Sequence, residues 1–500
     1  MKLIASGKEM QRIDAYTIQE IGIPGLVLME KAALAMEEEL IVRFAHKPST
    51  LIVVERGNNG GDGLALGRLL YERGFPVTIY EIGGVERPSL SYQTQYQILR
   101  HLGIPVRDNL PGEKHELIVD GIFGVGLSRE VRGIHAEVIR ELNSRAAFRI
   151  AIDVPSGVDA GSGRILGTAF RADLTITFGL LKTGLLLYPG ASCCGSVVVK
   201  DIGFPAKAVR EISPSAFTYE LSDLSRLPQR KAWSNKGTYG KVLMVAGSKN
   251  MAGAAALCSE AAYRSGSGLV RIFTPEVNRV ILQNQVPEAI LTTYQGEEEA
   301  FKELREALSW ASVIGFGCGL GQNSLTEKML RLIADEGTAP LVLDADGLNV
   351  LARMKQEDPE GAGKLMNYQH GIILTPHLAE MSRLSGRTLE EIRDSLMETA
   401  QAMADDKHIV VLKDARTIVS CGDGLDYINT SGNHGMAVGG SGDVLTGIIC
   451  GFLAGGASPA EAARLGVYCH GLAGDKAAEN TGHFGLLARD ILDGLVRVLP

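Results

Sequence analysis

The 500-residue sequence predicts an α/β protein with two successive domains. Three observations favour this fold class. The length is enough for two to four domains of ordinary size. Short, continuously apolar runs alternate with segments of helical spacing, which is typical of parallel strands covered by helices on both faces. The apolar pattern weakens over 205–230, so we place a domain boundary near 213–228.

In the first half, six apolar runs are predicted strands, at 51–55, 77–81, 117–120, 149–153, 174–178 and 196–200. Residues 63–74 carry leucines at helical spacing, and Gly74 is a stop signal for that helix. Right-handed crossovers between such strands give an open doubly wound sheet, whose binding site lies at the carboxyl ends of the strands.

The second half repeats this alternation. Its predicted strands lie at 241–247, 269–273, 312–317, 341–345, 371–375, 409–413 and 417–420. An Ala-rich segment from Ala252 to Arg264 is a predicted helix. A second helix is predicted at 443–456, where the apolar residues form one stripe.

Composition excludes several classes of protein. The chain has 50 basic and 58 acidic residues and no basic block, so we expect neither a nucleic acid nor a membrane as partner. The longest nearly apolar stretch, 445–457, is too short to span a bilayer, and the N-terminus does not read as a secretory signal. Seven cysteines without a CxxC pair favour a reducing compartment. We therefore expect a cytoplasmic enzyme that acts on small molecules.

The densest glycine cluster of the first half is GNNGGDG at 57–63, which is predicted to be a loop between a strand and a helix. Glycine allows close backbone approach, and a helix N-terminus offers free N–H groups to an anion. Asn58, Asn59 and Asp62 add polar groups for a ligand or a cation. The alternative is a tight turn with Asp62 as a helix N-cap.

Three more strand ends of the first half carry polar residues. Asp120 precedes a glycine-rich loop at 124–130, Asp153 and Ser156 follow the next strand, and Lys182 follows another. The carboxylate and hydroxyl oxygens suit an alkali or alkaline-earth ion better than zinc. Lys182 is interpreted equally well as catalytic or as a solvated loop lysine.

The strongest motif of the second half is GNHGMAVGGSGD at 432–443, followed by the predicted helix. Glycines and a serine before a helix N-terminus form an anion hole from backbone amides. Asp443 could then take a proton from a hydroxyl held beside a bound phosphate, which suits phosphoryl transfer. The alternative makes Asp443 an N-cap.

Other predicted strand ends of the second half support this site. The loop 317–321 is glycine-rich, and Asp344 and Asp346 are interpreted equally well as site residues or as turn and cap residues. For His377 we favour ligand contact over a structural role. The segment 413–417 could bind nucleotide phosphate or sugar.

The motifs NNGGDG, VD-x-IFG-x-GL, DVPSG and ADLTITFG, in this order, resemble the NAD(P)H-hydrate epimerase domain over residues 1–215. The resemblance implies a Rossmann-like fold that interconverts the R and S epimers of hydrated NADH and NADPH. It also implies K⁺ near Asn59, Asp120 and Ser156. Implied hydrate contacts are Asn58, Asn59, Gly60, Gly61, Asp62, Gly124, Val125, Gly126, Leu127, Ser128, Arg129, Glu130 and Asp153. The family usually has proline where this chain has Leu181.

The motifs KGTYGKVLMVAGS, GAAAL, SGSGLV, G-x-GLG, LDADGLN, LTPH-x-x-E, LK-x-A-x-T and GGSGDVLTG resemble the ADP/ATP-dependent NAD(P)H-hydrate dehydratase domain over residues 225–500. The resemblance implies a ribokinase-like fold in which ADP or ATP, with Mg²⁺, phosphorylates the hydrate, and loss of phosphate regenerates NAD(P)H and leaves AMP or ADP. Implied hydrate contacts are Ala254, Gly319, His377 and Asp443, and implied nucleotide contacts are Lys413, Asp414, Ala415, Arg416, Thr417 and Gly442. Cys318, Leu378–Ala379 and Asp414 depart from the usual residues.

Together the two halves predict a bifunctional repair enzyme. Asp443 is the predicted base of the dehydratase, and Asp153, with Lys182 behind it, is the predicted proton-handling group of the epimerase. We also expect a homo-oligomer, through helices that flank the sheets. One alternative is a kinase for a sugar or vitamin precursor, which would leave a phosphorylated product. Another is a protein that senses nicotinamide nucleotides without turnover.

Overall fold

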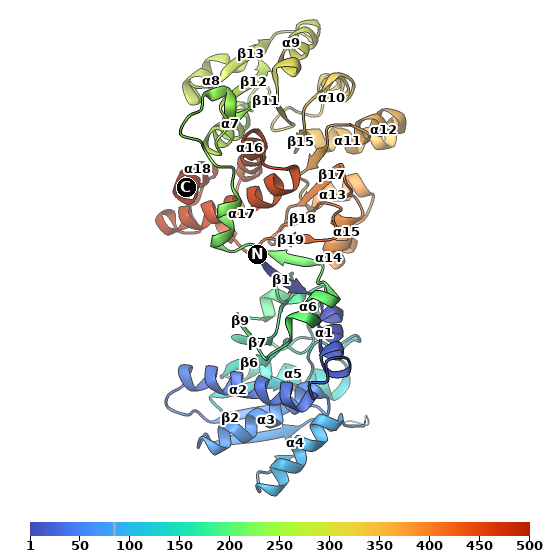
Figure 1. The fold of residues 1–500 in the computed structure, drawn as a ribbon, viewed down its shortest axis with the longest axis vertical. Coiled ribbons are helices and arrows are strands. Elements are labelled where there is room, and N and C mark those ends of the chain that lie inside the picture. The colour runs from blue at the N-terminus through green and yellow to red at the C-terminus, as the bar shows by residue number, and fades with distance from the viewer. Residues whose placement is uncertain (84–86) are drawn as a thin grey trace. The chain divides into compact units, whose positions relative to one another are not determined.

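The structure, a computed structural model, describes residues 1–83 and 87–500 (Figure 1). The chain forms two compact units. The first unit is Leu3–Phe217, and the second is Thr218–Pro500 together with Met1–Lys2. No helix among the described residues is long and apolar enough to cross a membrane.

The first unit contains a parallel sheet of seven strands in the order β4-β3-β2-β5-β6-β7-β9. These strands are β2 (Thr50–Val54), β3 (Val77–Glu81), β4 (Val106–Arg107), β5 (Leu117–Gly121), β6 (Phe148–Ile152), β7 (Leu174–Phe178) and β9 (Ser196–Lys200). The strand order reverses between β2 and β5, so the sheet is doubly wound and the predicted fold class is confirmed. A ligand site is expected at this reversal, beyond the carboxyl ends of the two strands.

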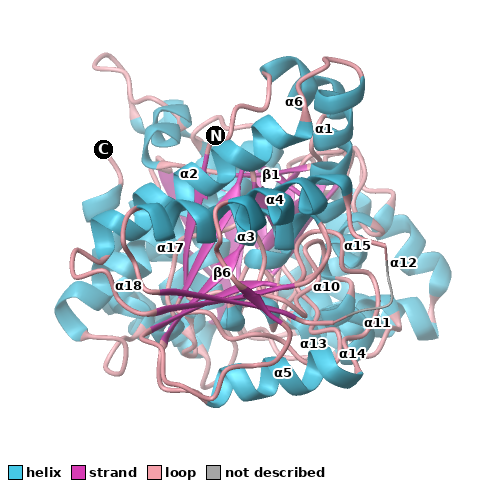
Figure 2. Cartoon of the chain, turned by 90° about the horizontal axis from the view of Figure 1, so that it is seen from below, coloured by secondary structure: helices cyan, strands magenta, loops and turns pink. Residues whose placement is uncertain are grey.

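Helices cover both faces of this sheet, on opposite sides of the strands in Figure 2. They are α2 (Gly25–Arg43), α3 (Asn58–Glu72), α4 (Leu90–His101) and α5 (Gly133–Ser144). Along β2, Ile52 and Val54 pack in a core with α2, α3 and α4, whereas Leu51 and Val53 pack in a second core with α5. Successive strand residues point to opposite faces. This explains why residues 51–54 of β2 are all apolar.

The remaining elements of the first unit lie outside this sheet. Helix α1 (Gly7–Gln19) shares an apolar cluster with α6 (Ala206–Ile212), and the short strands β1 (Lys2–Ala5) and β8 (Leu181–Lys182) pair in parallel. Ser6 and Glu9 form a capping box at the start of α1. β10 (Ala216–Thr218) lies where the chain passes from one unit to the other.

The prediction that residues 57–63 form a loop is wrong. Helix α3 already begins at Asn58, and its N-cap is Gly57. None of the four glycines of this segment has a positive φ. They are needed for close packing instead. A Cβ atom at Gly60 would lie 1.7 Å from the carbonyl oxygen of Glu55, and one at Gly63 would lie 2.7 Å from Val54 Cγ1. The glycines thus bring the first turns of α3 directly against the end of β2.

The second unit contains a sheet with the strand order β13-β12-β11-β14-β15-β16-β17-β18-β19. Its strands are β11 (Lys241–Val245), β12 (Leu269–Pro275), β13 (Ile290–Tyr294), β14 (Val313–Phe316), β15 (Leu341–Leu343), β16 (Ile372–Leu374), β17 (His408–Leu412), β18 (Ile418–Ser420) and β19 (Asp426–Ile428). The strands pair in parallel as far as β17, whereas β18 and β19 are antiparallel. The carboxyl ends of the parallel strands form the edge that carries the second site.

The helices of the second unit are α7 (Ala252–Arg264), α8 (Arg279–Gln285), α9 (Glu297–Trp310), α10 (Ser324–Glu336), α11 (Asp346–Glu357), α12 (Pro359–Met366), α13 (Leu378–Ser385), α14 (Leu389–Asp394), α15 (Leu396–Gln401), α16 (Ser441–Ala454), α17 (Pro459–Thr481) and α18 (Ala488–Val498). α7 and α16 are in extensive contact. Gly447 permits this, because a Cβ atom there would lie 2.1 Å from the carbonyl oxygen of Cys258. The packing fixes the N-terminus of α16 relative to the sheet.

Candidate active sites

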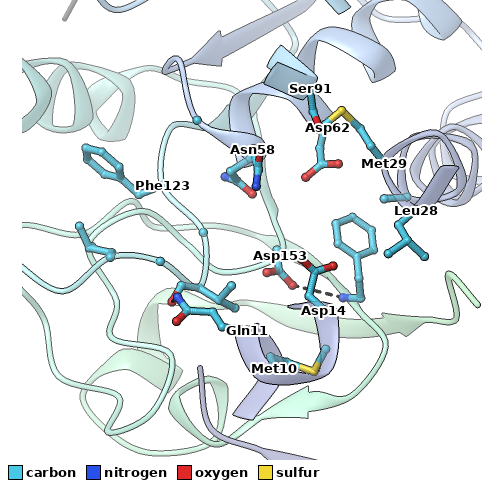
Figure 3. A pocket seen from close by; sticks show the side chains of 18 of the residues that line it. Met10, Gln11, Asp14, Leu28, Met29, Asn58, Asp62, Ser91, Phe123 and Asp153 are labelled. Atoms are coloured by element: carbon cyan, nitrogen blue, oxygen red, sulfur yellow. Dashed lines mark hydrogen bonds between the residues drawn. The ribbon is translucent and has the colours of Figure 1, made fainter. Parts of the chain in front are cut away.

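The first unit has a cavity of about 610 Å³ at the reversal of its strand order (Figure 3). It is lined by parts of α1, α2 and α3 and by the loop 122–129. Of the predicted site residues, the structure places these around the cavity: Asn58, Asn59, Asp62, Gly124, Val125, Gly126, Leu127, Ser128, Arg129, Asp153 and Lys182. Gly60 and Gly61 are buried inside α3, and Glu130 is exposed and paired with Arg132. These three residues therefore do not line the cavity.

Asp153 and Lys182 form a buried ion pair in the wall of this cavity. Lys182 Nζ donates to Asp153 Oδ1 at 2.6 Å and also to Thr177 Oγ1 and the Phe178 carbonyl. The Lys182 side chain is only 1% exposed, so the interpretation as a solvated loop lysine is wrong. Burial lowers the pKa of Lys182, and the charge of Asp153 opposes this shift. Asp153 has a φ of 64°, an uncommon backbone conformation for aspartate at a strand end.

Two further carboxylates face the same cavity, as Figure 3 shows for Asp14 and Asp62. Burial raises the pKa of Asp14, and the charge of Asp153 adds to the shift. The pKa of Asp62 is raised well above its usual value by burial and by the charges of Asp153 and Asp14. Asp14 is not a predicted residue, since it lies in α1, outside every glycine-rich motif.

The start of the loop 122–129 contacts three of the predicted residues, Asn59, Asp120 and Ser156. Ser156 Oγ donates to Asp120 Oδ1 at 2.6 Å, and the Phe123 N–H donates to Ser156 Oγ at 2.8 Å. A Cβ atom at Gly124 would lie 2.9 Å from Asn59 Oδ1. The Asn59 side-chain nitrogen is buried without a partner among the described residues. Burial raises the pKa of Asp120 to about 6. A buried amide without a partner and a fully buried carboxylate, both at the start of the same loop, fit a cation once the amide is turned to present its oxygen.

The second site lies at the N-terminus of α16. Its N-cap is Gly440, with a φ of 92°, and no side chain caps the helix. Asp443 is therefore in the first turn and is not the N-cap. Burial raises the pKa of Asp443 to about 6, with a further contribution from the charge of Asp344. The uncapped backbone N–H groups and this carboxylate can together receive an anion and a proton.

Lys413 and Asp344 form an ion pair beside Asp443. Lys413 Nζ donates to Asp344 Oδ1 at 2.7 Å, and Thr446 Oγ1 donates to Oδ2 at 2.7 Å. Burial opposes ionisation of Asp344, but the charge of Lys413 and these hydrogen bonds outweigh it and lower the pKa. Gly442 lies close by, since a Cβ atom there would be 3.3 Å from Lys413 Nζ. The structure thus brings the predicted residues Lys413, Gly442 and Asp443 together.

The other predicted residues of the second unit have varied surroundings. Gly319 lies against Ala254, where an added Cβ would be 2.8 Å from the Ala254 Cβ. His377 caps α13 by accepting hydrogen bonds at Nδ1, and its backbone bridges to Lys413. The residues Asp414, Ala415, Arg416 and Thr417 form the turn between β17 and β18, with Asp414 and Ala415 exposed. Asp346 accepts a hydrogen bond from the Gly321 N–H at 2.7 Å. Asp346 therefore anchors the glycine loop.

Each of the two units matches a known protein family. A family model described as NAD(P)H-hydrate dehydratase matches residues 242–497, and one described as YjeF-related protein N-terminus matches residues 25–184. The chain is 37% identical to a bifunctional NAD(P)H-hydrate repair enzyme of Moorella thermoacetica, over 99% of this chain and 96% of that relative. The chain belongs to the family of bifunctional NAD(P)H-hydrate repair enzymes.

Further similarities agree with this membership. A bifunctional NAD(P)H-hydrate repair enzyme of Thermofilum pendens is 35% identical, over 99% of this chain and 96% of that relative. A ribokinase-like superfamily protein of Enterococcus faecalis has a structure that matches with a TM-score of 0.50 and 28% identity, over 57% of this chain and 95% of that one. The second fold is therefore ribokinase-like, as predicted. Membership of the repair-enzyme family favours hydrate repair over the kinase and sensor alternatives.

Proposed function

We propose that the chain epimerises hydrated NADH and NADPH in the first unit and dehydrates the S epimer in the second unit with ADP or ATP. The observation that carries this proposal is the pair of separate sites, each with a lysine–aspartate ion pair beside a glycine-rich helix start. A stereospecific dehydratase alone would leave one epimer unrepaired. A fused epimerase removes this restriction. We place the reaction in the cytoplasm and expect a homo-oligomer, to be measured by light scattering.

In the dehydratase, Asp443 accepts the proton of the hydrate's hydroxyl as that oxygen attacks the terminal phosphorus of the nucleotide. The backbone N–H groups at the start of α16 stabilise the transferring phosphoryl group. The ring nitrogen then expels inorganic phosphate, and loss of a ring proton forms the carbon–carbon double bond of NAD(P)H. AMP or ADP is the second product. Lys413, held by Asp344, supplies positive charge near Gly442 for the nucleotide phosphates.

For Mg²⁺, the protein offers a poor set of ligands. Cys318, Asp344 and Asp443 are the group of the described residues that places three candidate ligand atoms within 4.8 Å of one another. Mg²⁺ prefers hard oxygen ligands, whereas this group contains a thiol and a carboxylate already paired with Lys413. These side chains therefore do not form a Mg²⁺ site of the usual kind.

In the epimerase, we propose that Asn59, Asp120 and Ser156 hold K⁺. Bound K⁺ would supply the positive charge that the buried Asp120 lacks, and so would order the loop from Ile122 onwards. Asn58, Asp62 and the loop 124–130 would contact the hydrate, and Asp153 would handle the proton with Lys182 holding it in place. Backbone atoms of Gly60 and Gly61 would contribute only through the position of α3.

The test follows absorbance at 340 nm, where reduced nicotinamide absorbs and its hydrate does not. The full chain is given mixed R and S hydrate with Mg²⁺, K⁺ and either ADP or ATP. Recovery beyond the S fraction establishes both activities, and the faster nucleotide identifies the donor. Recovery that stops at the S fraction contradicts the epimerase. No recovery, with a phosphorylated product instead, would support the kinase alternative.

A further inference from the structure

The cavity of the first unit contains more acid groups than its one ion pair needs. Asp14, Asp62 and Asp153 all line it, with Lys182 as the ammonium group in its wall. Among the described residues, these three carboxylates do not form a group whose oxygen atoms all lie close enough together to hold a metal ion. They therefore surround a space that a ligand can occupy.

Asp14 is held at the cavity by the geometry of α1. Gln11, one turn earlier on the same helix, donates from Nε2 to the Val125 carbonyl at 3.0 Å and so ties α1 to the loop 122–129. Residues three apart share a helix face, so Asp14 projects towards the same space as Gln11. Within residues 1–83 and 87–500, Asp14 has no hydrogen bond and no cation partner. Figure 3 shows its carboxyl group beside that of Asp153.

Asp153, by contrast, is held by hydrogen bonds from three neighbouring residues. All of its side-chain hydrogen bonds from described residues fall on Oδ1, from Thr177, Phe178 and Lys182. This leaves Oδ2 free to accept a proton. Asp153 is paired with the ammonium group of Lys182, whereas Asp14 has no such partner, and burial together with the charge of Asp153 raises the pKa of Asp14. The two neighbouring carboxyl groups thus differ in environment, as an acid and a base must.

We propose that Asp14 is the catalytic acid of the epimerase, which protonates the departing hydroxyl of the hydrate while Asp153 deprotonates the water that adds to the opposite face. This assignment rests on the proposed epimerase function. The carbon–oxygen bond breaks with help from the lone pair of the ring nitrogen, and water leaves with the Asp14 proton. A new carbon–oxygen bond then forms, and its proton passes to Asp153. Exchange with solvent returns one proton to Asp14 and removes one from Asp153. No oxidant or reductant is needed.

The test uses the chain's own dehydratase as reporter. With mixed hydrates and nucleotide, absorbance at 340 nm should rise in a fast phase for the S epimer and a slower phase limited by epimerisation. Asp14→Asn should leave the fast phase unchanged and slow the second at least 100-fold, since general acids contribute about 10²–10⁴-fold. Asp14→Glu should retain part of the second phase. Asp108→Asn, an exposed position of the same unit, should change neither phase.

Two further readouts separate catalysis from a structural role. The wild-type second phase should slow as pH rises, because the acid must be protonated, and Asp14→Asn should lose this dependence. Epimerisation in H₂¹⁸O should place ¹⁸O in the hydrate. A second phase within threefold of wild type in Asp14→Asn, or retention of ¹⁶O, would overturn the assignment. A wild-type protein with no second phase at all would overturn the proposed epimerase function and this assignment with it.

Discussion

As the proposed base, Asp443 should set the pH dependence of the dehydratase. Its pKa is raised to about 6 by burial and by the charge of Asp344. A base must be deprotonated, so the rate of dehydration should fall as pH drops below about 6. An aspartate with an ordinary pKa would keep its activity to about pH 4. The measurement is kcat/KM for the S hydrate between pH 5 and 8. Asp443→Asn should lose at least 100-fold at every pH and still bind hydrate, whereas a flat wild-type profile would contradict this role.

Cys318 modulates the same carboxylate. Its thiol hydrogen-bonds to Asp443, and this bond lowers the pKa of Asp443 against the effect of burial. Cys318→Ala should therefore move the acidic limb of the dehydratase profile to higher pH, and Cys318→Ser should restore it. Cys421→Ala, a buried thiol elsewhere in the same unit, is the control and should leave the profile unchanged. An unchanged limb in Cys318→Ala would show that the hydrogen bond has no functional effect.

If K⁺ binds at the proposed site, Asp120 should link potassium to the stability of the first unit. Its pKa in the folded protein is about 6, raised from 3.8 by burial. The unfolded chain loses this proton first as pH rises, so the ionised group costs stability, on the order of 3 kcal/mol above pH 6. Bound K⁺ would offset this cost. Replacing tetramethylammonium by K⁺ should therefore raise the melting temperature at pH 7.5 and have little effect at pH 5. Asp120→Asn should abolish the difference, and an equal K⁺ effect at both pH values would contradict it.

Residues inside glycine-rich motifs were predictable from the sequence, whereas isolated ones were not. Asp153 and Lys182 follow apolar strands, and strand ends of a doubly wound sheet meet at one edge. Asp14, Gln11 and Met10 reach the cavity from an ordinary amphipathic helix, and only the tertiary packing of α1 brings them there. A single aspartate on a helix face reads as a solvated residue. The only sign of a buried role for Asp14 in the sequence was its place on the helix side that carries the apolar residues packed against α6.

At the scale of elements, the contact between α3 and β2 depends on Gly60. A Cβ atom at this position would meet the Glu55 carbonyl oxygen at 1.7 Å, and backbone cannot give way as a flexible side chain can. Gly60→Ala should destabilise the first unit by about 3 kcal/mol or more. The control is Gly363→Ala in α12, where nothing lies within 4 Å, and it should stabilise by about 0.5–1 kcal/mol. Denaturant unfolding measures both, and equal effects would contradict the packing argument.

The apolar runs predicted most strands to within one or two residues, because a strand buried on both faces has a continuous apolar signature. The strands β1, β4, β8 and β10, each of two to four residues, were not predicted, and neither were β13 and β19. β13 is partly exposed along most of its length, and β19 has three residues with an aspartate at its start, so neither carries that signature. The start of α3 was missed because glycine lowers helix propensity. Packing against β2 overrides propensity there, which sequence periodicity does not register.

At the scale of the whole molecule, each unit has its own sheet and its own site, so damage to one site should leave the other intact. Asp153→Asn should abolish epimerisation and leave dehydration of pure S hydrate within twofold of wild type. Asp443→Asn should do the reverse, with interconversion of R and S hydrate followed by chromatography. Loss of both activities in either variant, with unchanged thermal unfolding, would contradict the independence of the two sites.

All seven cysteines are unpaired and buried, two of them in the first unit and five in the second. A buried thiol does not react with an alkylating reagent until the structure around it opens. The number of alkyl groups on each molecule, read by mass spectrometry, therefore reports which unit has opened. A population carrying two groups has opened only the first unit, and one carrying five only the second. The native cysteines thus allow the unfolding of each unit to be followed separately, without an engineered probe.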